Sequence, residues 1–173
     1  MIPEKFRDQF VLSDDALFAE LTLMTDAFTD ELFTLPETTM VRFSVSRLLV
    51  DVERFPDDAG ETMSKKGMGM IYTRTAHGLN LKRALQADER SALKSQYYDA
   101  HHQKLLAEVN RELEAQGKAL IVDCHSFPSI PLPCDNDQST PRPAFCIGSD
   151  SFHTPRALVQ VAVDGPRNKG YSV

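Results

Sequence analysis

Apolar residues recur at every third or fourth position in three parts of the chain, which is typical of a helix with one buried face. The first part follows Ser13, a residue type that caps helix N-termini, and predicts a helix over residues 14–33. The second part predicts a long helix over residues 89–116 that ends at Gly117. A third helix is expected over residues 154–163, where a Thr-Pro pair supplies a cap and a first-turn proline.

Four other stretches carry the patterns of strands. Alternating apolar side chains predict a strand over residues 41–52. Residues 119–122 form a continuous apolar run too short for a helix, as in a strand buried on both faces. Two shorter strands are expected over residues 70–73 and 145–148. Because helices alternate with these strands, the sequence predicts an α/β fold, and its 173 residues with 42% apolar content suit a single domain, 1–173.

The charge of the chain limits its partners. The net charge is −6, so the chain repels nucleic acid and anionic membrane surfaces, and neither is expected as a partner. No apolar run approaches the roughly 20 residues of a membrane helix, and the N-terminus lacks the basic and apolar regions of a signal peptide. We therefore expect a cytoplasmic protein. Its three cysteines lack CxxC spacing, and no disulfide is expected.

The strongest candidate for chemistry is Asp123-Cys124-His125-Ser126, which follows the predicted buried strand and precedes an irregular loop with five prolines at residues 127–143. In open α/β sheets, ligands bind beyond the carboxyl ends of the strands. The imidazole of His125 could ligate zinc through one nitrogen while Asp123 holds the other. A hydrogen-bonded structural histidine fits the position equally well. A Cys124/His125 nucleophile is a third alternative, which a buried strand disfavours.

Several other polar residues have both a structural and a functional interpretation. Asp26 and Asp30 stand four positions apart on the predicted first helix, where a solvated acidic face is the simpler interpretation. Arg47 shares a strand face with apolar residues, and it either pairs with Asp51 on that face or grips an anionic substrate. His102 falls on the apolar face of the long helix and is interpreted as a hydrogen-bonded core histidine rather than a catalytic one.

Together these segments resemble the N-formylglutamate amidohydrolase family over most of the chain. The resemblance is carried, in chain order, by Ile2-Pro3-Glu4, Thr25-Asp26, Ser46-Arg47, Asp51, Arg54 through Asp58, His102 with its helix, Asp123-Cys124-His125-Ser126, and Phe145 through Ser149. The combination and its order are much more specific than any single piece.

This resemblance implies a three-layer fold, with a mixed sheet flanked by helices as in zinc carboxypeptidases. It also implies a hydrolase of histidine degradation that uses Zn²⁺ to cleave the linear amide C–N bond of a small N-acyl acidic amino acid such as N-formylglutamate. Asp26 and His125 would then be the zinc ligands. Arg47 and Arg54 would act in catalysis, holding the carboxylates of the substrate or polarising its carbonyl. Ser126 would also bind the substrate.

Some departures from the family pattern bear on activity. The family's first zinc-binding histidine would precede Ile2 and its general-base glutamate would follow Val173, so we expect a chain that is incomplete at both termini and holds zinc weakly. Glu53 and Cys146 each stand where the family has an asparagine. The alternative to a zinc-dependent hydrolase is therefore a catalytically inactive family member that binds an acidic metabolite or a partner chain.

Overall fold

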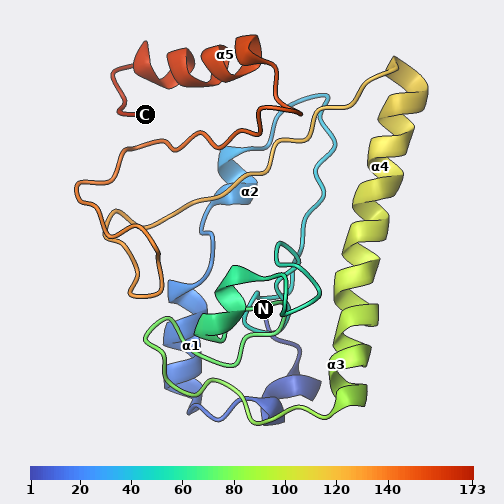
Figure 1. Cartoon of the computed structure of the whole chain (residues 1–173), viewed down its shortest axis with the longest axis vertical. Coiled ribbons are helices and arrows are strands. Elements are labelled where there is room, and N and C mark those ends of the chain that lie inside the picture. Colours follow the sequence, from blue (N-terminus) through green and yellow to red (C-terminus); the bar gives the residue numbers. More distant parts are fainter. The chain divides into compact units, whose positions relative to one another are not determined.

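The computed structural model describes residues 1–173 (Figure 1). The chain forms two compact units, Met1–Phe127 and Pro128–Val173. All of the site residues that the sequence singles out lie in the first unit, and each unit is described by itself below.

The first unit begins with a 3-10 helix, η1 (Glu4–Gln9), followed by α1 (Asp14–Leu23). The backbone N–H of Ala16 donates to Oγ of Ser13 at 3.3 Å, so the predicted cap is confirmed. The predicted continuation to residue 33 is wrong, because Phe28 has a φ of 64° and a left-handed residue cannot continue a right-handed helix. A short helix, α2 (Thr29–Leu32), follows, which leaves Asp26 in the break between α1 and α2.

The second half of this unit contains the longest helical stretch, which is unbroken in Figure 1. It consists of α3 (Ala87–Leu93), the π-helical η3 (Lys94–Asp99) and α4 (Ala100–Gln116). Gly117 ends it with a φ of 68°, as the sequence predicts. The predicted long helix is therefore confirmed in extent, while the wider π-turns in its middle carry no signal in the apolar spacing. One more 3-10 helix, η2 (Thr62–Lys66), lies earlier in the chain.

The structure contains no sheet, and the predicted three-layer α/β fold is wrong. Strand-like pairing is limited to isolated antiparallel bridges, which join Phe10 to Lys82, Met68 to Tyr72 and Arg74 to Asn80. The strands expected over residues 70–73 and 145–148 are therefore also wrong.

The predicted strand over residues 41–52 fails because its apolar end bends into a turn. The backbone N–H groups of Leu49 and Val50 donate to the carbonyl of Ser46 at 2.9 and 3.3 Å. Leu48, Leu49 and Val50 are all 0% exposed, whereas consecutive side chains of a strand point to opposite faces. These three residues pack with Met68, Tyr72, Leu81 and Leu93 to form the core of the first unit.

The predicted buried strand at residues 119–122 is an extended segment instead. Leu120, Ile121 and Val122 are 65%, 58% and 67% exposed, and no backbone group of residues 119–126 bonds to backbone elsewhere. A strand buried on both faces requires neighbouring strands, and the turn at residues 46–50 supplies none.

The second unit is mostly irregular, as its prolines predict. It contains one helix, α5 (Arg156–Arg167), which begins after Pro155 and runs four residues further than the sequence predicts. Arg142 pairs with Asp135 at 3.0 Å, and the backbone N–H of Phe145 donates to the carbonyl of Ser172 at 3.0 Å. In neither unit is a helix long and apolar enough to cross a membrane.

Candidate metal centre

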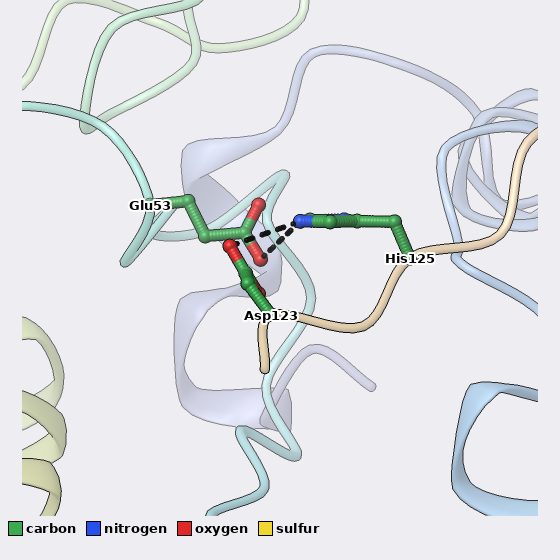
Figure 2. Close-up of side chains that lie close together, drawn as sticks. All are labelled: Glu53, Asp123 and His125. Carbon is green, nitrogen blue, oxygen red and sulfur yellow. Dashed lines mark ion pairs between the residues drawn. The ribbon is translucent and has the colours of Figure 1, made fainter. Parts of the chain in front are cut away.

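The imidazole of His125 lies at the centre of a group of acidic side chains. Its Nδ1 donates to Oδ2 of Asp26 at 2.7 Å, although the two residues are 99 positions apart in the chain. Its Nε2 lies 3.3 Å from Oδ2 of Asp123 and 3.5 Å from Oε1 of Glu53. Figure 2 shows both of these carboxylates turned toward the same edge of the imidazole. The two ring nitrogens therefore face different partners.

The distances separate two kinds of contact. Two ligand atoms on one tetrahedral zinc ion, each about 2.0–2.1 Å from the metal, lie about 3.3 Å apart. The separations of His125 Nε2 from Asp123 and Glu53 match that value, and the ligand atoms of these three residues all lie within 4.8 Å of one another. The contact with Asp26 is shorter, at 2.7 Å, which is too close for two ligand atoms of one zinc ion and fits only a hydrogen bond. One imidazole nitrogen and two carboxylates thus fit a divalent cation.

The carboxylates stabilise a positive charge at this point. Hydrogen bonds to Asp123 and then to Asp26 raise the pKa of His125 to about 10, and the negative charge of Glu53 adds to that effect. The same hydrogen bond from His125 lowers the pKa of Asp123. Burial raises the pKa of Glu53, against the opposing effects of His125 and Arg47. A metal ion that binds Nε2 must displace a proton from the imidazole, so metal affinity at this group should rise with pH.

Arg47 borders the group but does not form the expected pair with Asp51. Its NH2 donates to Oδ2 of Asp26 at 3.1 Å and lies 3.6 Å from Oε2 of Glu53. Asp26 is therefore not part of a solvated acidic face, because it contacts both His125 and Arg47 and its side chain is only 21% exposed. Asp30 does fit that interpretation, since it is exposed and pairs with Arg42 at 3.7 Å.

Arg54 belongs to a second, more buried polar group. Its Nε lies 3.4 Å from Oδ2 of Asp51, and its NH1 lies 3.9 Å from Oε1 of Glu61. The hydroxyl of Tyr72 donates to the same Oδ2 of Asp51 at 2.8 Å. Burial, followed by the charge of Asp51, raises the pKa of Tyr72 and keeps its hydroxyl protonated as a donor. Arg54 Nε is buried without a hydrogen bond of its own.

Cys124 and Ser126, the other two residues of the 123–126 segment, contribute no candidate metal ligand. Ser126 is half-buried directly after His125. Cys124 places its Sγ 3.6 Å from the carbonyl of Val122, and burial followed by the charge of Asp123 raises the pKa of its thiol. A thiol with a raised pKa is a poor nucleophile near neutral pH, so the structure gives no support to the Cys124/His125 alternative.

The sequence interpretation noted Glu53 only as a departure from the family pattern and did not name it as a ligand. Glu53 supplies one of the three candidate ligand atoms, whereas Asp26, the ligand that the resemblance implied, holds the far nitrogen of the imidazole. The available signal was the acidic residue standing where the resembling family has an asparagine.

The sequence model of one protein family, described as N-formylglutamate amidohydrolase, matches residues 1–173. No curated protein and no solved structure gives a match.

Proposed function

The chain belongs to the N-formylglutamate amidohydrolase family, and we propose that it is a metal-dependent hydrolase that cleaves the amide of an N-formyl acidic amino acid such as N-formylglutamate. The observation that supports this proposal most is the convergence of His125 Nε2, Asp123 and Glu53 on one point, in a chain that the family matches throughout. Amide hydrolysis without a covalent intermediate needs an activated water and a polarised carbonyl, and a divalent cation supplies both.

The residues that would hold the metal follow from the distances. Glu53, Asp123 and Nε2 of His125 would be its ligands, and Zn²⁺ is proposed because it accepts imidazole and carboxylate together. Asp26 would fix the tautomer and orientation of the imidazole through Nδ1. When bound, the metal would polarise the amide carbonyl and lower the pKa of the attacking water.

Arg47 is the proposed contact for the carboxylates of the substrate. Both of its ion pairs use one terminal nitrogen, so the planar guanidinium has further N–H donors for a bidentate contact. Arg54 and Ser126 are proposed to complete the substrate site, on the strength of the family resemblance. An acidic amino acid substrate would then meet a cation beside the metal.

The test is zinc content and N-formylglutamate hydrolysis measured on the same sample, for the wild type and for His125→Ala. We expect the variant to lose zinc affinity by at least about 100-fold, because a ligand is lost, and to lose turnover with it. His153→Ala is the matched control, since His153 forms a similar exposed pair with Asp150 at 2.8 Å in the other unit. Full zinc occupancy in His125→Ala would contradict the assignment of His125 as a zinc ligand.

The role of Asp26 has a separate test in Asp26→Asn. This variant keeps a side chain of the same shape but places a weaker partner on Nδ1, so zinc affinity should fall about 10- to 100-fold with the ligands intact. Asp30→Asn, which changes an exposed carboxylate four positions away, should bind zinc as the wild type does. Equal affinities in the two variants would assign Asp26 no role in the site.

One observation favours a second function, the binding of an acidic metabolite without catalysis. Arg47 and a protonated His125 set two positive charges against the three carboxylates of the group, which offsets most of the charge that would repel an acidic ligand. Calorimetry with N-formylglutamate in the presence of a zinc chelator separates the two functions. Binding that is unaffected by the chelator, without turnover when zinc is supplied, would favour the second.

A further inference from the structure

We propose that Tyr98 and His102 are positioning residues, which hold the backbone on both sides of Glu53 and so aim its carboxylate into the candidate metal centre. This inference rests on the proposed metal-dependent function, and it adds two residues that do not contact the metal group themselves. It also explains what the π-helical turns of η3 do, because they bring Tyr98 to the backbone beside Glu53.

The two side chains contact the backbone carbonyls of Val52 and Arg54, the residues on either side of Glu53. The hydroxyl of Tyr98 donates to the carbonyl of Arg54 at 2.9 Å, and Nε2 of His102 donates to the carbonyl of Val52 at 2.8 Å. Their rings lie against each other, with centroids 4.4 Å apart. The pair therefore acts as a clamp with one hydrogen bond on each side of Glu53. His102 is hydrogen-bonded, as the sequence predicts, but it is exposed rather than part of the core.

The N–H of Glu53 is fixed from the opposite direction. It donates to Oδ1 of Asp51 at 3.0 Å, while Oδ2 of Asp51 accepts from Tyr72. Asp51 is 2% exposed, and its own N–H donates to the carbonyl of Met70 at 2.8 Å. With its N–H and the carbonyls of both neighbouring residues engaged, the backbone at Glu53 has little freedom, and the point from which its side chain extends is fixed before any ligand binds.

The π-helical segment brings Tyr98 to this position. Leu93 and Tyr98 are the two buried apolar residues of the α3–η3–α4 helix, at 1% and 9% exposure. They are five positions apart, and an α-helix with 3.6 residues per turn would place them about 140° apart around its axis. The i to i+5 hydrogen bonds of a π-helix bring residues five apart onto one face. The expansion at residues 94–99 thus lets Leu93 pack in the core while Tyr98 reaches the 52–54 backbone.

The clamp matters because Glu53 is balanced between two cations. Its Oε1 lies 3.5 Å from Nε2 of His125, and its Oε2 lies 3.6 Å from NH2 of Arg47. A carboxylate that rotates away with a loosened backbone would leave the metal with two protein ligands, and ligand sets that are misplaced by about 1 Å lose most of their function. Loss of the clamp should therefore weaken metal binding although every ligand is still present.

The experiment is direct titration of Zn²⁺ against a competing chelator dye, with the metal-depleted full chain as wild type, Tyr98→Phe and His102→Leu. We expect each variant to bind zinc about 10- to 100-fold more weakly, the range for residues that orient ligands. His102→Gln, whose amide N–H can replace that of Nε2, should recover most of the affinity. Tyr97→Phe and His101→Gln are the matched controls, because Tyr97 packs edge-on against Phe6 and His101 against Phe43.

The outcomes separate this inference from the function on which it rests. Zinc binding in the wild type with unchanged affinity in both variants would overturn the clamp alone. No zinc binding in the wild type would overturn the metal-dependent function, and the clamp with it. If the two side chains had a purely structural role, Tyr98→Phe and His102→Leu would lower the free energy of unfolding without changing the zinc affinity of the folded chain. His102→Gln would then have no loss of zinc affinity to restore. If one variant loses its helical circular dichroism and is therefore unfolded, the zinc affinity of the other variant tests the clamp, because each variant removes a hydrogen bond to a different carbonyl.

Discussion

The two sides of the candidate metal centre are built in different ways. Glu53 comes from a turn whose backbone is hydrogen-bonded at Asp51, Val52 and Arg54 and which lies beside the core. Asp123 and His125 come from an extended, exposed segment whose backbone bonds to no other backbone. On the first side the fold sets the position of the ligand, while on the second side the imidazole of His125 is held only by its own side-chain contacts.

This difference shows where order in the site originates. The turn at residues 51–54 is preorganised, so metal binding there costs little further ordering. The segment at residues 119–126 depends on Asp26 to hold His125, and a bound cation would add the second attachment. Binding of the metal should therefore stabilise the exposed side more than the buried side.

The largest effect that would test this contrast is expected from Asp51→Ala. The substitution removes a buried carboxylate from Tyr72 and Arg54, and it should lower the free energy of unfolding by about 3 kcal/mol, measured by urea denaturation without metal. Asp123→Ala, on the exposed side, should change it by less than about 0.5 kcal/mol. Similar losses in the two variants would mean that both sides are built into the core.

A second, smaller effect concerns the pH dependence of the buried side. Lys82 is 7% exposed, and its Nζ donates to the carbonyl of Leu49 at 2.9 Å. Burial, with a minor effect of Arg90, lowers the pKa of Lys82 from 10.5 to about 7. Between these values the unfolded chain binds the proton and the folded chain does not, so the free energy of unfolding should rise as the pH rises from 7 toward 10.5.

Comparison with Lys82→Met isolates this effect. From pH 7 to pH 9 the wild type should gain at least about 1 kcal/mol relative to this variant, which corresponds to roughly one pKa unit. Lys104→Met, which changes an exposed lysine of α4, should keep the slope of the wild type. Parallel stability curves for the wild type and Lys82→Met would show that Lys82 is solvated.

The smallest expected effect is that of Val122→Thr on the exposed segment. Val122 is 67% exposed, so a hydroxyl in place of a methyl group should change the free energy of unfolding by less than about 0.5 kcal/mol. The same substitution at Val50, which is 0% exposed, should cost about 1–3 kcal/mol, because it buries a hydroxyl in the core. A loss above 1 kcal/mol in Val122→Thr would show that residues 119–122 are packed in solution.

The sequence predicts best those features that neighbouring residues decide. Ser13 caps α1 and Gly117 ends α4, because capping depends on bonds within one helical turn. The sheet fails because a strand needs a partner elsewhere in the chain, and the apolar pattern at residues 41–52 is equally suited to a buried turn. The left-handed Phe28 and the π-helical turns of η3 have no signal in apolar spacing, because each depends on packing that the spacing does not specify.

The candidate site was predictable in part. His125, Asp26 and Arg47 do come together, and the family resemblance was the source of that expectation. Their exact contacts were not predictable, because they depend on the geometry of segments far apart in the chain. Glu53 was missed as a ligand because its replacement of the family's asparagine marks the position without showing that it faces His125.

The exposed run Leu120-Ile121-Val122 also has a consequence for the behaviour of the protein at high concentration. Its side chains are apolar, and its backbone donors and acceptors have no backbone partners. Such a segment is a template on which an identical segment of another molecule can pair, and repulsion between molecules of net charge −6 opposes this pairing. Added salt should therefore promote self-association, and the association would begin only a few residues from the imidazole of His125.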